Sequence, residues 1–68
     1  MSDPAYFTPE SLAEHLQIPI ATIYQWRYRG EGPPGFRVGR HVRFRKADVA
    51  AWVEEQMNRD RTVAAARG

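Results

Sequence analysis

A proline at position 19 and the segment GEGPPG at residues 30–35 most constrain how this chain can fold. Proline cannot continue the hydrogen-bond ladder of a helix, and a run of glycine and proline favours turns over regular structure. The chain before residue 36 is therefore divided into short elements. With 68 residues in total, it amounts to one small domain.

A first short helix is predicted over about 9–16. Thr8 lies at its N-cap position, Pro9 at its first helical position and Glu10 in its first turn, as is typical of a helix start. Apolar residues then recur at helical spacing, which predicts one face that packs against the rest of the domain.

A second helix is predicted over about 20–28, after the interruption at Pro19. Ile23 and Trp26 lie three residues apart and are expected to face the first helix. Gly30 follows as a stop signal. Two short helices joined by a turn of about three residues form the outline of a helix-turn-helix.

A two-stranded hairpin is predicted from FRVGRHVRF, residues 36–44, because the sequence alternates with period two on each side of Gly39. The apolar members of this run are expected to share one face as core or cross-strand residues, while the arginines of the strands project from the other face. The apolar set is Phe36, Val38, Val42 and Phe44, the projecting set is Arg37 and Arg43, and the expected tip is Arg40 with His41.

Positive charge is concentrated in one part of the chain. Residues 27–46 contain seven arginines and lysines and one glutamate, a net charge of +6, whereas the remainder carries three arginines and seven acids, a net charge of −4. A concentration of one sign points to a polyanionic partner, and nucleic acid is the partner it favours. The alternative is a hairpin whose charges only keep it soluble and protect its edges.

A third helix is predicted over about 47–57, with Asp48 in its first turn. Its apolar stripe of Val49, Trp52, Val53 and Met57 is assigned to the core. The predicted organisation is therefore mainly α with a small β-hairpin. It comprises a flexible N-terminus (1–5), a folded domain (6–57) and a C-terminal tail (58–68) that is frayed or weakly helical.

Several classes of function are disfavoured by composition. There is no cysteine, which excludes disulfides and a Cys/His zinc site, and two histidines are too few to build a metal site alone. No apolar run approaches the roughly 18 residues that span a bilayer, and no signal-peptide pattern is present. No paired carboxylates or nucleophile with a base stand out. The sequence thus predicts a soluble intracellular domain that is not an enzyme and holds no metal or cofactor.

The order helix, turn, helix, basic hairpin, helix carries a set of residues that resembles a known family. The set is Thr8-Pro9-Glu10 with Leu12-Ala13, Thr22-Ile23-Tyr24, Arg29-Gly30, Phe36-Arg37-Val38-Gly39-Arg40, and Arg45 with Asp48 and Trp52. On these residues the stretch 6–52 resembles the excisionase/MerR-like winged-helix DNA-binding domains, and among them the small excisionases (recombination directionality factors) of mycobacteriophages. Two positions depart from the family pattern, because Pro19 and Lys46 stand near places where a small polar cap is common.

The resemblance implies a winged helix-turn-helix whose second helix enters the major groove of DNA. Gln25 is expected to pair with adenine, and Arg40 at the wing tip is the best candidate for insertion into a groove. Surface packing of Tyr24 and Tyr28, or stacking of Trp26 on a base, are the alternatives. The expected DNA-binding residues are Ala21, Thr22, Tyr24, Gln25, Arg27 and Tyr28 in the recognition helix, and Arg37, Gly39, Arg40, His41 and Arg43 in the wing.

The resemblance further implies an architectural role in DNA recombination. An excisionase binds and bends the arm of a bacteriophage attachment site and directs the integrase toward prophage excision. The partners implied are double-stranded DNA, the integrase and neighbouring copies of the same chain on DNA, in the cytoplasm of the bacterial host cell. The alternative is a small phage or prophage transcriptional regulator that uses the same DNA-binding domain.

Overall fold

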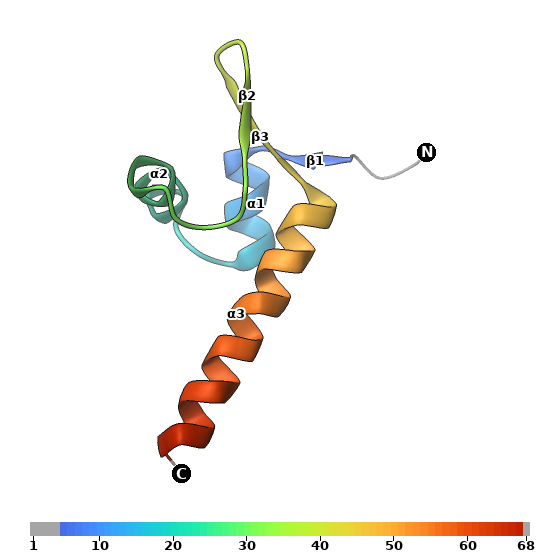
Figure 1. The fold of residues 1–68 in the computed structure, drawn as a ribbon. Helices are drawn as coiled ribbons and strands as arrows, with labels where there is room; N and C mark the ends of the chain where they lie inside the picture. Colours follow the sequence, from blue (N-terminus) through green and yellow to red (C-terminus); the bar gives the residue numbers. More distant parts are fainter. Residues whose placement is uncertain (1–4, 68) are drawn as a thin grey trace.

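The computed structural model describes the backbone of residues 5–67 and the side chains of residues 5–61. Three helices surround a small sheet. Figure 1 shows that the wing hairpin and the distal half of the last helix point in opposite directions. The predicted fold class is confirmed. The elements are β1 (Tyr6–Phe7), α1 (Pro9–Leu16), α2 (Ile20–Arg29), β2 (Phe36–Val38), β3 (His41–Arg45) and α3 (Lys46–Arg67).

The N-terminus is tied to the domain at Ala5. Its carbonyl accepts a hydrogen bond from the backbone N–H of Lys46 at 3.2 Å. Residues 1–4, which make up most of the predicted flexible N-terminus, lie outside the described residues.

Helix α1 begins with a capping box. Thr8 Oγ1 accepts a hydrogen bond from the Ser11 backbone N–H at 3.0 Å, and the Thr8 backbone N–H donates to Ser11 Oγ at 2.8 Å. The box satisfies backbone donors that have no partner within the helix. Pro9 follows in the first turn. The predicted helix bounds and the Thr8 cap are confirmed.

Helix α2 begins without a side-chain cap. Pro19 occupies the N-cap position and makes no capping hydrogen bond. At the other end, the N–H groups of Gly30 and Glu31 donate to the carbonyls of Arg27 and Trp26. Gly30 has φ +73°, a left-handed conformation that glycine adopts without steric cost, so the helix stops there, one residue later than predicted.

The wing hairpin turns through only two residues, Gly39 and Arg40. β2 and β3 are antiparallel, and Val38 lies opposite His41 at the end of the ladder. Because the loop has an even number of residues, an even-numbered residue of β2 always opposes an odd-numbered residue of β3. Opposed residues project from the same face of a sheet.

The predicted common face for the four apolar residues of the hairpin is therefore wrong. Phe36 and Val38 lie on the outer face and are 40% and 57% exposed. The arginines divide as well, since Arg37 shares the inner face with Val42 while Arg43 lies on the outer face. The tip assignment also changes, because His41 is the first residue of β3 and only Gly39 and Arg40 turn the chain. The outer face comprises Phe36, Val38, His41, Arg43, Arg45 and Tyr6.

A third strand, β1, completes the sheet and was not predicted. It pairs antiparallel with β3, so that Tyr6 opposes Arg45 and Phe7 opposes Phe44. The strand order is β1-β3-β2, which makes β3 the central strand. Two residues are too short to show an alternating pattern, and the partner strand is distant in the sequence.

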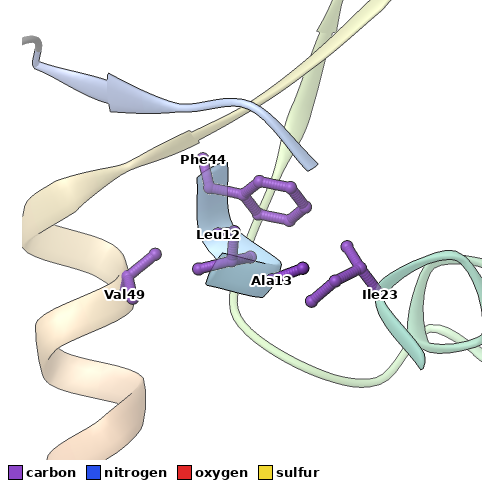
Figure 2. Packing of buried hydrophobic residues seen from close by; sticks show 5 residues of the cluster. All are labelled: Leu12, Ala13, Ile23, Phe44 and Val49. Carbon is purple, nitrogen blue, oxygen red and sulfur yellow. The ribbon is translucent and has the colours of Figure 1, made fainter. Parts of the chain in front are cut away.

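The core contains one side chain or more from each helix and from the central strand, as Figure 2 shows. Its buried members are Leu12 and Ala13 of α1, Ile23 of α2, Phe44 of β3 and Val49 of α3. Half-buried apolar residues, including Phe7, Val42 and Val53, pack around them. The core thus fixes α2 and the wing relative to each other, because Ile23 and Phe44 belong to the same cluster.

The two tryptophans lie at the edge of this core. Trp26 packs against the cluster but is only half-buried, and Trp52 is half-buried beside it. Their ring centroids are 5.1 Å apart. The predicted apolar stripe of the last helix is confirmed for Val49 and Val53, whereas Met57 is 51% exposed and lies outside the core.

Helix α3 is longer than predicted. It begins at Lys46 and continues to Arg67, ten residues beyond the predicted end at Met57. The prediction ended the helix where the apolar stripe ends, but no glycine or proline interrupts the chain before Gly68. Alanine and arginine favour the helical state without tertiary contacts, so the tail continues as a helix that projects from the domain (Figure 1).

We expect Gly35→Ala to destabilise the domain by about 1–3 kcal/mol. A Cβ at Gly35 would lie 2.7 Å from Cε1 of Phe44, whose ring is enclosed by the core and cannot move aside. Gly39→Ala is the control, because that position has φ +62° and no atom within 4 Å, which leaves only a left-handed backbone cost of roughly 1 kcal/mol. Urea denaturation of both variants measures the difference, and equal losses of stability would contradict this packing argument.

Candidate nucleic-acid interface

Helix α2 presents a continuous exposed face opposite its contact with the core. Ile23 is 1% exposed, so the residues on the other side of the helix face outward. Ala21, Gln25 and Tyr28 are exposed at spacings of four and three, which places them on one face. Tyr28 is 91% exposed and packs on little else. Among the other predicted contact residues, Tyr24 and Arg27 are exposed and Thr22 is half-buried.

Arg27 lies at the junction between α2 and the wing. Its Nη1 atom is 3.3 Å from the point that a Cβ on Gly35 would occupy, immediately before β2 begins. A glycine at that position lets the loop pass close to both the Phe44 ring and this guanidinium. The positive charge at the end of α2 therefore adjoins the base of the wing.

The wing carries cationic side chains on both faces and at its tip. Arg40 is exposed in the two-residue loop, and Figure 1 shows that the hairpin extends well clear of the helices. Arg37 is exposed on the inner face and His41 on the outer face. Arg43 is half-buried, and its Nη1 donates to the Val42 carbonyl at 2.8 Å, which holds the guanidinium along the strand.

Arg45 is paired within the protein. Its Nε and Nη2 atoms donate to the two carboxylate oxygens of Asp48 at 2.9 and 3.0 Å. This bidentate hydrogen bond lowers the pKa of Asp48 and raises the pKa of Arg45. The pair joins the last residue of β3 to the first turn of α3. It was not predicted, although an Asp three residues after an Arg at a helix start is visible in the sequence.

Lys46 also has an internal contact, because its Nζ atom lies 5.2 Å from the centroid of the Phe7 ring. This is the geometry of a cation–π interaction. Of the seven arginines and lysines in residues 27–46, five thus form neither an ion pair nor a cation–π contact within the described side chains. They are Arg27, Arg29, Arg37, Arg40 and Arg43.

The outer face of the wing also has an aromatic part that was not predicted. Tyr6 and Phe36 meet edge to face on the outer side of the sheet, with ring centroids 5.6 Å apart. Together with Val38, His41 and Arg43 they line a shallow hollow of about 290 Å³. This surface follows from the loop length and from β1, neither of which was predicted.

The described residues offer neither a membrane-spanning helix nor a cluster of metal ligands. No helix there is long and apolar enough to cross a membrane. Nor does that part of the chain contain a group of three or more His, Cys, Asp or Glu side chains that could hold a metal ion.

A helix-turn-helix with an exposed second helix, followed by a basic wing on a shared core, defines a winged helix-turn-helix DNA-binding domain. The family model for the helix-turn-helix domain matches residues 6–57, and the chain belongs to that family, which includes excisionase-like DNA-binding proteins. Neither the curated proteins nor the solved structures give a significant match. DNA binding is accordingly the function class of this domain.

Proposed function

We propose that this protein is an excisionase: it binds the arm of a phage attachment site in the bacterial cytoplasm, bends the DNA and directs the integrase toward prophage excision. The observation that carries the proposal is the combination of an exposed α2 face with a projecting basic wing, in a chain of a family that includes excisionase-like proteins. The residue-level resemblance to phage excisionases supports this function over transcriptional regulation.

In the proposed complex α2 lies in the major groove and the wing reaches the phosphates or an adjacent minor groove. Gln25 is exposed at the middle of the outward face of α2, where its amide can bond the edge of an adenine. Ala21 precedes it by one turn and can meet a thymine methyl group. Thr22, Tyr24 and Arg27 flank this face and contact phosphates, which position the protein without reading sequence.

We expect Gln25→Ala to weaken binding to the specific site by about 1–3 kcal/mol and to leave binding to random DNA unchanged. Arg40→Ala is the contrasting variant, because a phosphate contact at the wing tip contributes to binding on any DNA sequence. Its loss should reduce the slope of log affinity against log salt concentration by about one unit. Fluorescence anisotropy with specific and scrambled duplexes measures both. If Gln25→Ala weakens binding equally on the two duplexes, Gln25 does not read bases.

Several copies bind neighbouring sites in this proposal, since one recognition helix with one wing covers only a few base pairs. The outward side of α1, with Glu10 and Glu14 exposed, can face the basic surface of the next copy. Such a head-to-tail contact does not close and extends along DNA. In this proposal the C-terminal segment, residues 58–68, contacts the integrase. Titration onto fragments with one, two and three sites tests the assembly, and independent binding without added bending would contradict it.

The test of the function is an excision reaction with the integrase, attachment-site DNA and varying amounts of this protein. An excisionase raises the yield of excised product and lowers integration. A transcriptional regulator leaves both reactions unchanged and represses or activates a promoter near its binding site instead. Arg40→Ala, which weakens DNA binding, is expected to reduce the stimulation of excision.

A further inference from the structure

A groove lies between the loop after α2 and one side of α3, away from the outward face of α2. Its volume is about 720 Å³, within the range of sites that hold small ligands or peptide segments. Along α3 its lining residues recur at three- and four-residue spacing, so the groove follows the helix over several turns. The side chains that matter for its chemistry are Trp26, Trp52, Glu31, Asp48, Glu55 and Arg59.

The two tryptophans form the apolar part of the groove. The centroids of their rings lie 5.1 Å apart. Both residues are half-buried, so indole surface remains open to solvent. Gly32 lies directly against Trp26, since a Cβ there would come within 2.7 Å of the ring. The loop therefore holds the indole in place. Tryptophan on a partly open surface is typical of the centre of a protein interface.

The charged part of the groove is acidic, in contrast to residues 27–46 as a whole. Glu31 and Glu55 are exposed, and neither forms an ion pair with another of the described side chains. Asp48 is already paired with Arg45. With Arg59 as the single cation of the lining, the groove repels phosphate and attracts a cationic side chain.

We propose that this groove binds an arginine-bearing peptide segment of a partner protein. A guanidinium can stack on an indole face and donate to a carboxylate at once, because it is planar and carries its donors at the edge. Arginine fits this pair of functions better than lysine, whose ammonium is a compact and strongly hydrated charge. Asp48 with Arg45 already provides one such carboxylate–guanidinium pair beside the groove.

The probe is the acetylated, amidated peptide Gly-Arg-Gly-Arg-Gly, with the same peptide containing citrulline in place of arginine as its uncharged control. Titration is followed by the indole N–H signals of Trp26 and Trp52 in NMR spectra of the free protein. We expect both indole signals to move with a Kd on the order of millimolar, and the citrulline peptide to bind at least about fivefold more weakly. Because no DNA is present, failure here is distinct from failure of the proposed excisionase function.

Charge-neutral variants locate the site. Glu31→Gln and Glu55→Gln should each weaken binding of the arginine peptide by roughly two- to fivefold. Glu54→Gln, an exposed position of α3 outside the groove lining, should leave the affinity for the peptide unchanged. Unmoved indole signals, equal binding of the citrulline peptide, or an equal effect of Glu54→Gln would each overturn the proposal. So would self-association of the protein in sedimentation that Glu55→Gln abolishes, since the occupant would then be a second copy of this chain.

Discussion

Phe44→Ala should remove a large part or all of the free energy of unfolding of this domain. The Phe44 ring is 1% exposed and lies between the helices in Figure 2. Truncating a buried phenylalanine costs about 3–5 kcal/mol through lost burial and the cavity left behind. A domain of this length has a free energy of unfolding of roughly 3–10 kcal/mol, so the loss removes a large part or all of it. Urea denaturation followed by circular dichroism measures the change.

Phe36→Ala is the matched control in the same hairpin. Phe36 is 40% exposed on the outer face, and its ring meets that of Tyr6, a residue that is 48% exposed. We expect its loss to cost about 1 kcal/mol, since exposed side chains leave no cavity. Similar destabilisation by the two substitutions would contradict the assignment of the two faces of the hairpin.

DNA affinity should fall steeply with salt. Each phosphate that a cation neutralises releases condensed counterions. The logarithm of the binding constant therefore falls with the logarithm of the salt concentration, with a slope of about −0.9 per phosphate contact. The five arginines of residues 27–46 that are free of internal pairing therefore give a slope of about −4 to −5 if all reach phosphates. Between 50 and 200 mM salt, affinity then decreases by roughly several hundred-fold. Fluorescence anisotropy across salt concentrations measures the slope.

Two variants distinguish arginines that contact phosphates from arginines that only add to the net charge of the protein. Arg61→Gln removes an exposed charge on the distal part of α3 and should leave the slope unchanged. Arg45→Gln should also leave it nearly unchanged, because Asp48 already holds that guanidinium. A flat salt dependence, or an equal reduction by Arg61→Gln and Arg40→Gln, would show that the wing does not bind phosphates.

Local signals in the sequence were enough to predict the helix starts and the exposed face of α2. Thr8 and Pro9 mark the beginning of α1 because capping depends on residues within one turn. Ile23 is buried and Gln25 exposed, as helical periodicity predicts. Whether the exposed residues contact DNA stays a prediction.

Non-local structure was the part that could not be predicted. The pairing of β1 with β3 depends on the path of the whole chain and leaves no pattern in a two-residue strand. The half-burial of Trp26 and Trp52 depends on how closely α3 and the loop at Gly32 approach. Asp48 pairs with Arg45, so this cation contributes less to the basic surface than the others do. A count of charges along the sequence includes Arg45 in full.

The two-residue loop at Gly39 and Arg40 also affects how the wing can change by mutation. Strand β3 is held by Phe44 in the core and by pairing with β1, so an insertion at the tip shifts β2 alone. One added residue would bring Phe36 and Val38 to the inner face and turn Arg37 to the outer face, without any substitution in the strands. Single-residue insertions and deletions at this turn are therefore the genetic events that would exchange charged and apolar residues across the wing in one step.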